Sequence, residues 1–151
     1  MGKKYVFTVG AVLRGDDACG PMLSKMMEQN PIEGWDHIDG EMTPENYIGV
    51  IKRENPDKVV LVDAAQMGLE PGEMRLLNRD DVVANYMVTT HSMPLTYLID
   101  EIKAYCGELL FIGIQPAQLE FFAPMTPEVL ASVERVYEAV KAEDFSGIQP
   151  A

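Results

Sequence analysis

Short runs of almost uninterrupted apolar residues alternate along this chain with stretches of helical periodicity. The runs cover residues 5–9, 59–62 and 109–114 and consist largely of Val, Ile, Leu and Phe. Strands that helices cover on both faces have this composition, whereas strands with one wet face alternate apolar and polar residues. The pattern therefore predicts a three-layer α/β domain in which a mostly parallel sheet lies between helices.

Weaker signals complete a twisted, mixed sheet of roughly five strands. A fourth strand is predicted at residues 35–38, and a short edge strand at 73–77 follows the turn signal Pro71-Gly72. Helices are predicted at residues 21–29, 44–54, 94–105 and 127–141. Thr43 and Thr126 each precede a proline in the first turn of a predicted helix, so we expect both threonines to be N-caps.

The length of 151 residues suits one domain over residues 1–151. No linker or low-complexity segment divides the chain, and residues from about 144 to 151 are expected to form a loose tail. Apolar residues make up 47% of the chain, but no run approaches the roughly 18 apolar residues of a membrane-spanning helix. The first residues are interpreted as a strand rather than a signal peptide, because charged residues soon follow their short apolar run.

The net charge of −12, with a pI near 4.4, argues against two classes of partner. Nucleic acid is bound mainly through Lys and Arg, and an anionic membrane surface repels an acidic protein. Cys19 and Cys106 lie far apart in the sequence and form neither a disulfide framework nor a thiolate metal motif. We expect a cytoplasmic monomer that binds no nucleic acid and inserts into no membrane.

Three aspartates and a histidine lie in or next to the loops that are predicted to connect strands and helices. Asp16 and Asp17 follow the first strand in a glycine-spaced loop, Asp63 ends the strand at 59–62, and His91 shortly precedes a helix. In open α/β sheets, ligands gather at the carboxyl ends of strands. Carboxylate oxygen and imidazole nitrogen suit a divalent metal of borderline hardness. These four residues are therefore the candidate site.

Each candidate residue also has a purely structural interpretation. Asp16 or Asp17 could cap the helix at 21–29 or shape a Gly-Asp turn, and Asp63 could accept backbone N–H bonds. His91 could be a structural histidine. Met93, beside it, either fills the core or lines a groove for an apolar peptide. The sequence alone leaves these alternatives open.

Other chemistries find little support in the sequence. It contains no P-loop, no G-x-G-x-x-G and no G-x-S-x-G nucleophile motif. A nucleophilic pair of Cys19 and His91 is disfavoured, because neighbouring carboxylates raise the pKa of a thiol. A phosphoacceptor receiver domain shares the acidic loop and the Asp after the third strand, but it needs a lysine after the last strand, where this chain has residues 112–116 without one.

Five segments together resemble the [NiFe]-hydrogenase maturation endopeptidases, in particular the type that processes the large subunit of hydrogenase 3 in formate hydrogenlyase. These segments are VGAVLRGDDACGP, IDGEMTPENYI, VLVDAAQMGLEPGEMRLL, TTHSMPLTYLIDEIK and FIGIQPAQLEFFAPMTPEV. The resemblance implies a mixed, roughly five-stranded sheet and metal-binding positions at Asp17, Asp63 and His91. It further implies one cut near the C-terminus of the hydrogenase large-subunit precursor, made after nickel insertion by a protease of the aspartic type.

Two positions depart from the pattern of that family. Ala11 stands where the family usually has Asn, whose side chain could tie the first loop to its neighbours. Ala18 stands where the family usually has Gly, which adopts positive φ without steric cost. Neither departure removes a proposed ligand.

Two hypotheses of function follow from the residues and the resemblance. In the first, Asp17, Asp63 and His91 bind nickel carried by the substrate, and a water activated by the metal or by Asp16 cuts the peptide. A metal-free aspartic mechanism would instead need Asp17 and Asp63 to share a proton. In the second hypothesis the chain is a metal-dependent binding module or chaperone that holds the large subunit without cutting it.

Overall fold

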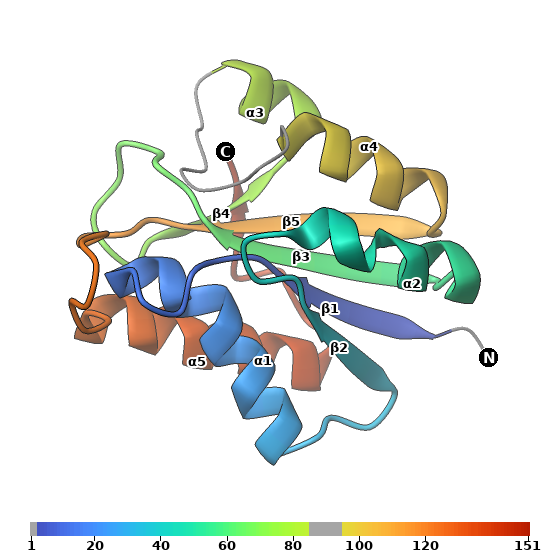
Figure 1. Ribbon diagram of the computed structural model, residues 1–151, viewed down its shortest axis with the longest axis horizontal. Coiled ribbons are helices and arrows are strands. Elements are labelled where there is room, and N and C mark those ends of the chain that lie inside the picture. Colours follow the sequence, from blue (N-terminus) through green and yellow to red (C-terminus); the bar gives the residue numbers. More distant parts are fainter. Residues whose placement is uncertain (1–2, 85–94) are drawn as a thin grey trace.

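A computed structural model describes residues 3–84 and 95–151 of the protein (Figure 1). Within these ranges one sheet has the strand order β2-β1-β3-β5-β4-β6. The strands are β1 (Lys4–Thr8), β2 (Trp35–Asp39), β3 (Lys58–Ala64), β4 (Met74–Leu77), β5 (Glu108–Ile114) and β6 (Gln149–Pro150). Strands β2, β1, β3 and β5 run parallel, whereas β4 is antiparallel to β5 and β6 is parallel to β4. The predicted α/β class with a mostly parallel, mixed sheet is confirmed.

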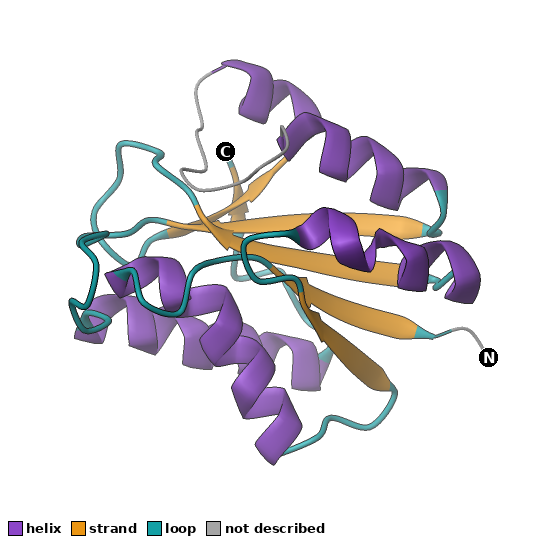
Figure 2. Ribbon diagram, in the orientation of Figure 1, coloured by secondary structure: helices purple, strands orange, loops and turns teal. Residues whose placement is uncertain are grey.

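Helices cover both faces of this sheet (Figure 2). On one face lie α1 (Cys19–Gln29) and α5 (Pro127–Ala142), and on the other lie α2 (Ile48–Glu54), α3 (Arg79–Ala84) and α4 (Leu95–Ala104). Two 3-10 helices, η1 (Gly15–Ala18) and η2 (Pro44–Tyr47), lead into α1 and α2. None of the helices in the described ranges is long and apolar enough to cross a membrane.

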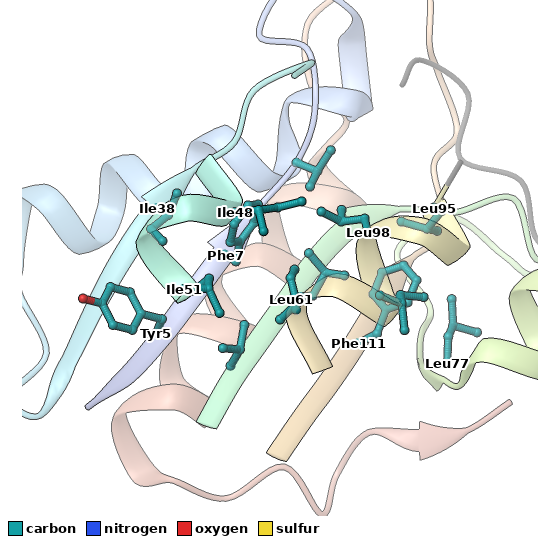
Figure 3. Packing of buried hydrophobic residues seen from close by; sticks show 14 of the residues in the cluster. Tyr5, Phe7, Ile38, Ile48, Ile51, Leu61, Leu77, Leu95, Leu98 and Phe111 are labelled. Carbon is teal, nitrogen blue, oxygen red and sulfur yellow. The ribbon is translucent and has the colours of Figure 1, made fainter. Parts of the chain in front are cut away.

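Successive strand residues pack into two separate cores. Phe7 and Leu61 pack with Ile51 and Leu98 on the side of α2 and α4 (Figure 3). Their strand neighbours pack against α1 and α5 in a second cluster that includes Val6, Val60, Val62, Leu23 and Val133. Both clusters contain fully buried side chains, so burial on two faces accounts for the continuous apolar runs in the sequence.

The two threonines predicted as N-caps do not cap their helices. Thr43 and Thr126 each precede the first proline of η2 or α5, but neither side chain bonds a helix N–H. The Thr126 hydroxyl instead donates to the Asp16 carboxylate, at 3.0 Å from Oδ1. A carboxylate from a distant loop has therefore displaced the local interaction that the sequence pattern predicts at Thr126.

The loose tail predicted over residues 144–151 is also wrong. Gln149–Pro150 form β6 beside β4, the Ala151 N–H donates to the Leu76 carbonyl at 3.0 Å, and Ile148 is only 7% exposed in the α1/α5 core. Without β6, the strand β4 would present an unpaired edge. The end of the chain therefore completes the sheet, which has six strands in the described ranges instead of roughly five.

The packing of the tail predicts a stability effect. Replacing Ile148 with Ala should lower the free energy of unfolding by about 2 kcal/mol, because it deletes buried carbon atoms from the core. Urea unfolding followed by circular dichroism measures this change. Gln149→Ala, at an exposed neighbouring position, is the matched control and should shift stability by less than about 0.5 kcal/mol. Equal stability of the two variants would show that the tail does not pack.

Candidate active site at the carboxyl end of the sheet

The loop after β1 is folded tightly against its neighbours. Gly10 has φ +152°, and a Cβ added there would lie 2.0 Å from the Asp17 carbonyl oxygen. Its N–H donates to the Glu41 carbonyl in the loop after β2, at 2.9 Å. Only glycine fits this close approach of two backbones. The loop is thereby fixed above the sheet and turns back into η1.

Asp17 lies on η1 and is completely buried. Its Oδ2 accepts the backbone N–H of Ala11 at 3.1 Å. Any residue except proline supplies that N–H at position 11, so Ala11 in place of Asn leaves this contact intact. Ala18 has φ −78°, an ordinary value for any residue, so its departure from Gly costs nothing in the backbone. Both departures are therefore compatible with the geometry of the loop.

Asp63 lies near the carboxyl end of β3 and is also completely buried. Its strand neighbours Val62 and Ala64 belong to the α1/α5 core, so strand alternation turns Asp63 toward the side of α2 and α4. The Val9 N–H donates to the Val62 carbonyl at 3.1 Å, which joins the end of β1 to the end of β3. The topology thus brings the chain segments of Asp17 and Asp63 to the same edge of the sheet.

Cys19, the first residue of α1, is a completely buried thiol directly after η1. Burial raises the pKa of this thiol well above its usual range, and the negative charges of Asp63, Asp17 and Asp16 raise it further. η1, which carries Asp16 and Asp17, also contacts β3, whose carboxyl end carries Asp63. A thiol held protonated is a poor nucleophile, which argues against a catalytic pair of Cys19 and His91.

The third proposed ligand, His91, and its neighbour Met93 lie outside the described residues. In the ranges 3–84 and 95–151, no three His, Cys, Asp or Glu side chains are arranged to hold a metal ion. Asp17 and Asp63 could therefore contribute two ligands to a metal, and a third would have to come from elsewhere. The sequence prediction of a three-ligand site stays a prediction.

Asp16 has contacts of a different kind, which tie two loops together. Its fully buried carboxylate accepts the N–H of Ala117 (2.8 Å), of Gln118 (3.0 Å) and of Thr126 (2.7 Å), and also the Thr126 hydroxyl. Its own N–H donates to the Gln118 carbonyl at 2.7 Å. These bonds join the loop after β1 to the loop after β5. Asp16 does not cap α1, whose N-terminus has no side-chain cap.

Gln115 is a site residue that the sequence interpretation missed. It is 5% exposed at the end of β5, where its Oε1 accepts the N–H of Met67 (2.7 Å) and of Leu69 (3.2 Å). Its Nε2 donates to the Gln66 Oε1 at 3.0 Å. These bonds hold the loop that follows Asp63. The sequence did contain a signal for this role, since Gln115 directly follows a strand predicted to be buried. A buried side-chain amide needs hydrogen-bond partners, which a neighbouring loop can supply.

A hollow opens beside η1, next to the carboxylates. Its volume is about 400 Å³, and most of its lining is apolar: Val12, Gly15, Ala18, Pro21, Met22, Ala123, Pro124 and Met125, with Lys25 and Asp39 as the charged members. Burial raises the pKa of Asp39 above its usual value. A polypeptide lying over η1 could place an apolar side chain in this hollow.

Comparison with known proteins extends the resemblance to nearly the whole chain. The hydrogenase maturation protease family matches residues 21–143. The hydrogenase 3 maturation protease of Escherichia coli K12 is 42% identical over 139 residues, which cover 92% of this chain and 89% of that protein. A crystal structure of the hydrogenase 3 maturation protease has a TM-score of 0.90 at 40% identity, covering 99% of this chain and 97% of that one. The crystal structure of a [NiFe] hydrogenase maturation protease from Thermococcus kodakarensis has a TM-score of 0.81 at 27% identity, covering 93% and 91%.

The network around Asp16 predicts a stability effect. Asp16→Asn should lower the free energy of unfolding by about 2–4 kcal/mol, because the amide places an NH₂ group against N–H donors that now bind a carboxylate. Asp36→Asn makes the same chemical change at an exposed position of β2 and should cost less than about 0.5 kcal/mol. Urea unfolding at pH 7 compares the two. Equal losses would show that the loops do not depend on Asp16.

The raised pKa of Cys19 predicts its reactivity. Because the folded protein keeps this thiol protonated well above the ordinary pKa of 9.0, its thiolate fraction at pH 8 is far smaller than that of an unperturbed cysteine. A disulfide reagent such as DTNB should therefore modify only the half-buried Cys106 in the native state and both cysteines in urea. In a Cys106→Ser variant the native protein should not react. Rapid native labelling of Cys19 would contradict the burial.

Proposed function

This chain belongs to the hydrogenase maturation protease family, and on that premise we propose that it removes the C-terminal extension of a nickel-loaded [NiFe]-hydrogenase large-subunit precursor. One observation carries the proposal. Two completely buried carboxylates, Asp17 on η1 and Asp63 near the carboxyl end of β3, belong to elements that contact each other. Carboxylate oxygens are suitable ligands for a divalent cation.

The nickel of the precursor is the cation that we assign to these acids. Nickel held by cysteine thiolates of the substrate keeps open positions, which Asp17, Asp63 and His91 would fill. The N–H of Ala11 fixes Oδ2 of Asp17 and stabilises its negative charge, as a metal ligand requires.

Recognition of nickel would make cleavage depend on a loaded precursor. A precursor without nickel lacks the anchor that positions its peptide bond in the site. Holding the ion between η1, the end of β3 and an imidazole would also fix the nearby substrate chain, which is catalysis by positioning. The enzyme would thus be specific for a precursor whose metal centre is complete.

The contacts of Asp16 assign it a positioning role rather than that of a base. Its two oxygens already accept bonds from three backbone N–H groups and a hydroxyl. Water is then the attacking group, and the substrate's nickel supplies the activation when it is bound. This scheme differs from an aspartic mechanism, in which Asp17 and Asp63 would share one proton.

A binding module without protease activity is the weaker alternative. It drew support from the departures at Ala11 and Ala18. However, Ala18 has an ordinary φ of −78°, and Ala11 contributes its backbone N–H, so neither residue distorts the loop. No feature of the described residues favours a chaperone over an endopeptidase.

Incubation of the protein with nickel-loaded and nickel-free precursor tests the proposal. Mass spectrometry of the large subunit should show loss of the C-terminal peptide only from the loaded form. Asp17→Asn, Asp63→Asn and His91→Ala should each lower the rate about a hundredfold or more while the circular dichroism spectrum is unchanged. Asp36→Asn, an exposed carboxylate on β2, should leave the rate unaltered.

Three results would contradict this assignment in different ways. Equal cleavage of both precursors would remove the recognition of nickel. Full activity of any one ligand variant would remove that residue from the site. An intact precursor mass together with a stable complex would identify a binding module.

A further inference from the structure

Exposed apolar side chains gather at the same end of the sheet as the carboxylates. Five of the nine large apolar residues that are exposed in the described ranges come from three loops there: Val12, Leu13, Met42, Phe121 and Phe122. These loops follow β1, β2 and β5, and the loop after β5 projects beyond the sheet beside η1 (Figure 1). Such a concentration of apolar surface is a mark of an interaction site.

The aromatic pair Phe121–Phe122 is the most exposed part of this surface. The Phe122 side chain is 81% exposed and that of Phe121 is 65% exposed, with ring centroids 6.3 Å apart. Phe122 has φ +65°, a left-handed conformation that is strained for a bulky residue. Its N–H donates to the Leu13 carbonyl at 2.6 Å. The strained backbone at Phe122 therefore directs a large aromatic ring into solvent. Backbone strain of this kind is found most often at functional sites.

The loop that carries the two rings is held rigidly by its neighbours. Arg14 Nε donates to the Leu119 carbonyl at 3.2 Å, and its guanidinium lies over the Phe121 ring at 5.3 Å. Gly15 approaches the loop so closely that an added Cβ would lie 2.4 Å from the Gln118 carbonyl oxygen. The backbone that carries the rings is therefore already ordered before binding, which lowers the entropic cost of using them as an anchor.

The chemistry of this surface selects one kind of occupant. The rings protrude, so they suit a depression on another macromolecule rather than a small ligand, which needs a concave site. The net charge of −12 disfavours an anionic membrane and also a second copy of the same chain. The loops that carry Leu13 and Phe122 also carry or anchor Asp16 and Asp17, so a protein bound here lies over the candidate active site.

We propose that Leu13, Phe121 and Phe122 form a docking knob that inserts into an apolar depression on the folded large-subunit precursor. The hollow of about 400 Å³ beside η1 receives an apolar side chain of the precursor in return. This inference rests on the proposed function for the identity of the partner. The knob contacts protein and not nickel, so it binds the precursor whether or not the metal is present.

Direct binding of nickel-free precursor to the immobilised protein tests the knob, because this form is held without being processed. Phe122→Asn removes the ring, and Asn tolerates the left-handed conformation, so the fold is kept. This variant and Phe121→Ser should each weaken binding about tenfold to thirtyfold. With loaded precursor, they should raise KM by a similar factor and leave kcat unchanged.

Tyr105→Ser is the matched control. Tyr105 is also an exposed aromatic residue with a cation over its ring, Lys52 at 5.3 Å, but it lies at the opposite end of the sheet just before β5. Its replacement should change neither binding nor KM. A loss equal to that of Phe122→Asn would show that any exposed aromatic ring contributes, which overturns a specific knob.

The remaining outcomes separate the knob from the catalytic assignment. Binding of the wild-type protein that depends on Phe122, without any cleavage of loaded precursor, supports the knob and overturns the proposed function. Absence of binding to nickel-free precursor, or affinities of the variants within twofold of wild type, overturns the knob. A wild-type dimer in sedimentation that Phe122→Asn dissociates would instead make this surface an interface between two copies of the chain.

Discussion

The bonds of the Asp16 carboxylate hold together the end of the molecule where the candidate site lies. A buried charge is stable only when its oxygens are fully engaged, and three backbone N–H groups with the Thr126 hydroxyl meet that need. The bonds join the loops after β1 and β5, which are separated by about a hundred residues in the sequence. The position of Asp17, one residue further on, and the display of Phe121–Phe122 both depend on this junction.

Parallel strand order explains why acidic residues meet at this edge. The carboxyl ends of β1, β3 and β5 lie side by side in the sheet, so the loops that follow them share one volume of space. Glycine at position 10 allows the first loop to fold back, and Gln115 holds the loop after β3. Burial, together with the charges of Asp63, Asp17 and Asp16, raises the pKa of the Cys19 thiol at this end of the sheet. The strand order and the contacts between loops therefore position the acidic side chains of the candidate site.

The sequence pattern predicted the regular elements well and their local chemistry less well. The three apolar runs became β1, β3 and β5, because burial on both faces leaves a direct mark on composition. The short helix α3 and the strand β6 leave no such mark, and β6 forms only because β4 offers an edge. Thr126 shows the same limit, since its hydroxyl serves Asp16 rather than its own helix. Of the metal-binding positions that the resemblance implies, Asp17 and Asp63 are buried on η1 and β3, which contact each other, whereas His91 lies outside the described residues.

The sequence by itself determined the layered α/β class and the acidic composition, because composition and periodicity are local properties of a chain. The metal-binding residues that it suggests stay a prediction. Only the tertiary structure decided that Asp16 joins two loops, that Asp17 and Asp63 are completely buried, that Ala11 and Ala18 fit without strain, and that the tail completes the sheet. It alone shows Phe122 held outward in a left-handed conformation. These features depend on contacts between segments far apart in sequence, and no local pattern encodes which hydrogen-bond donors a buried carboxylate will meet.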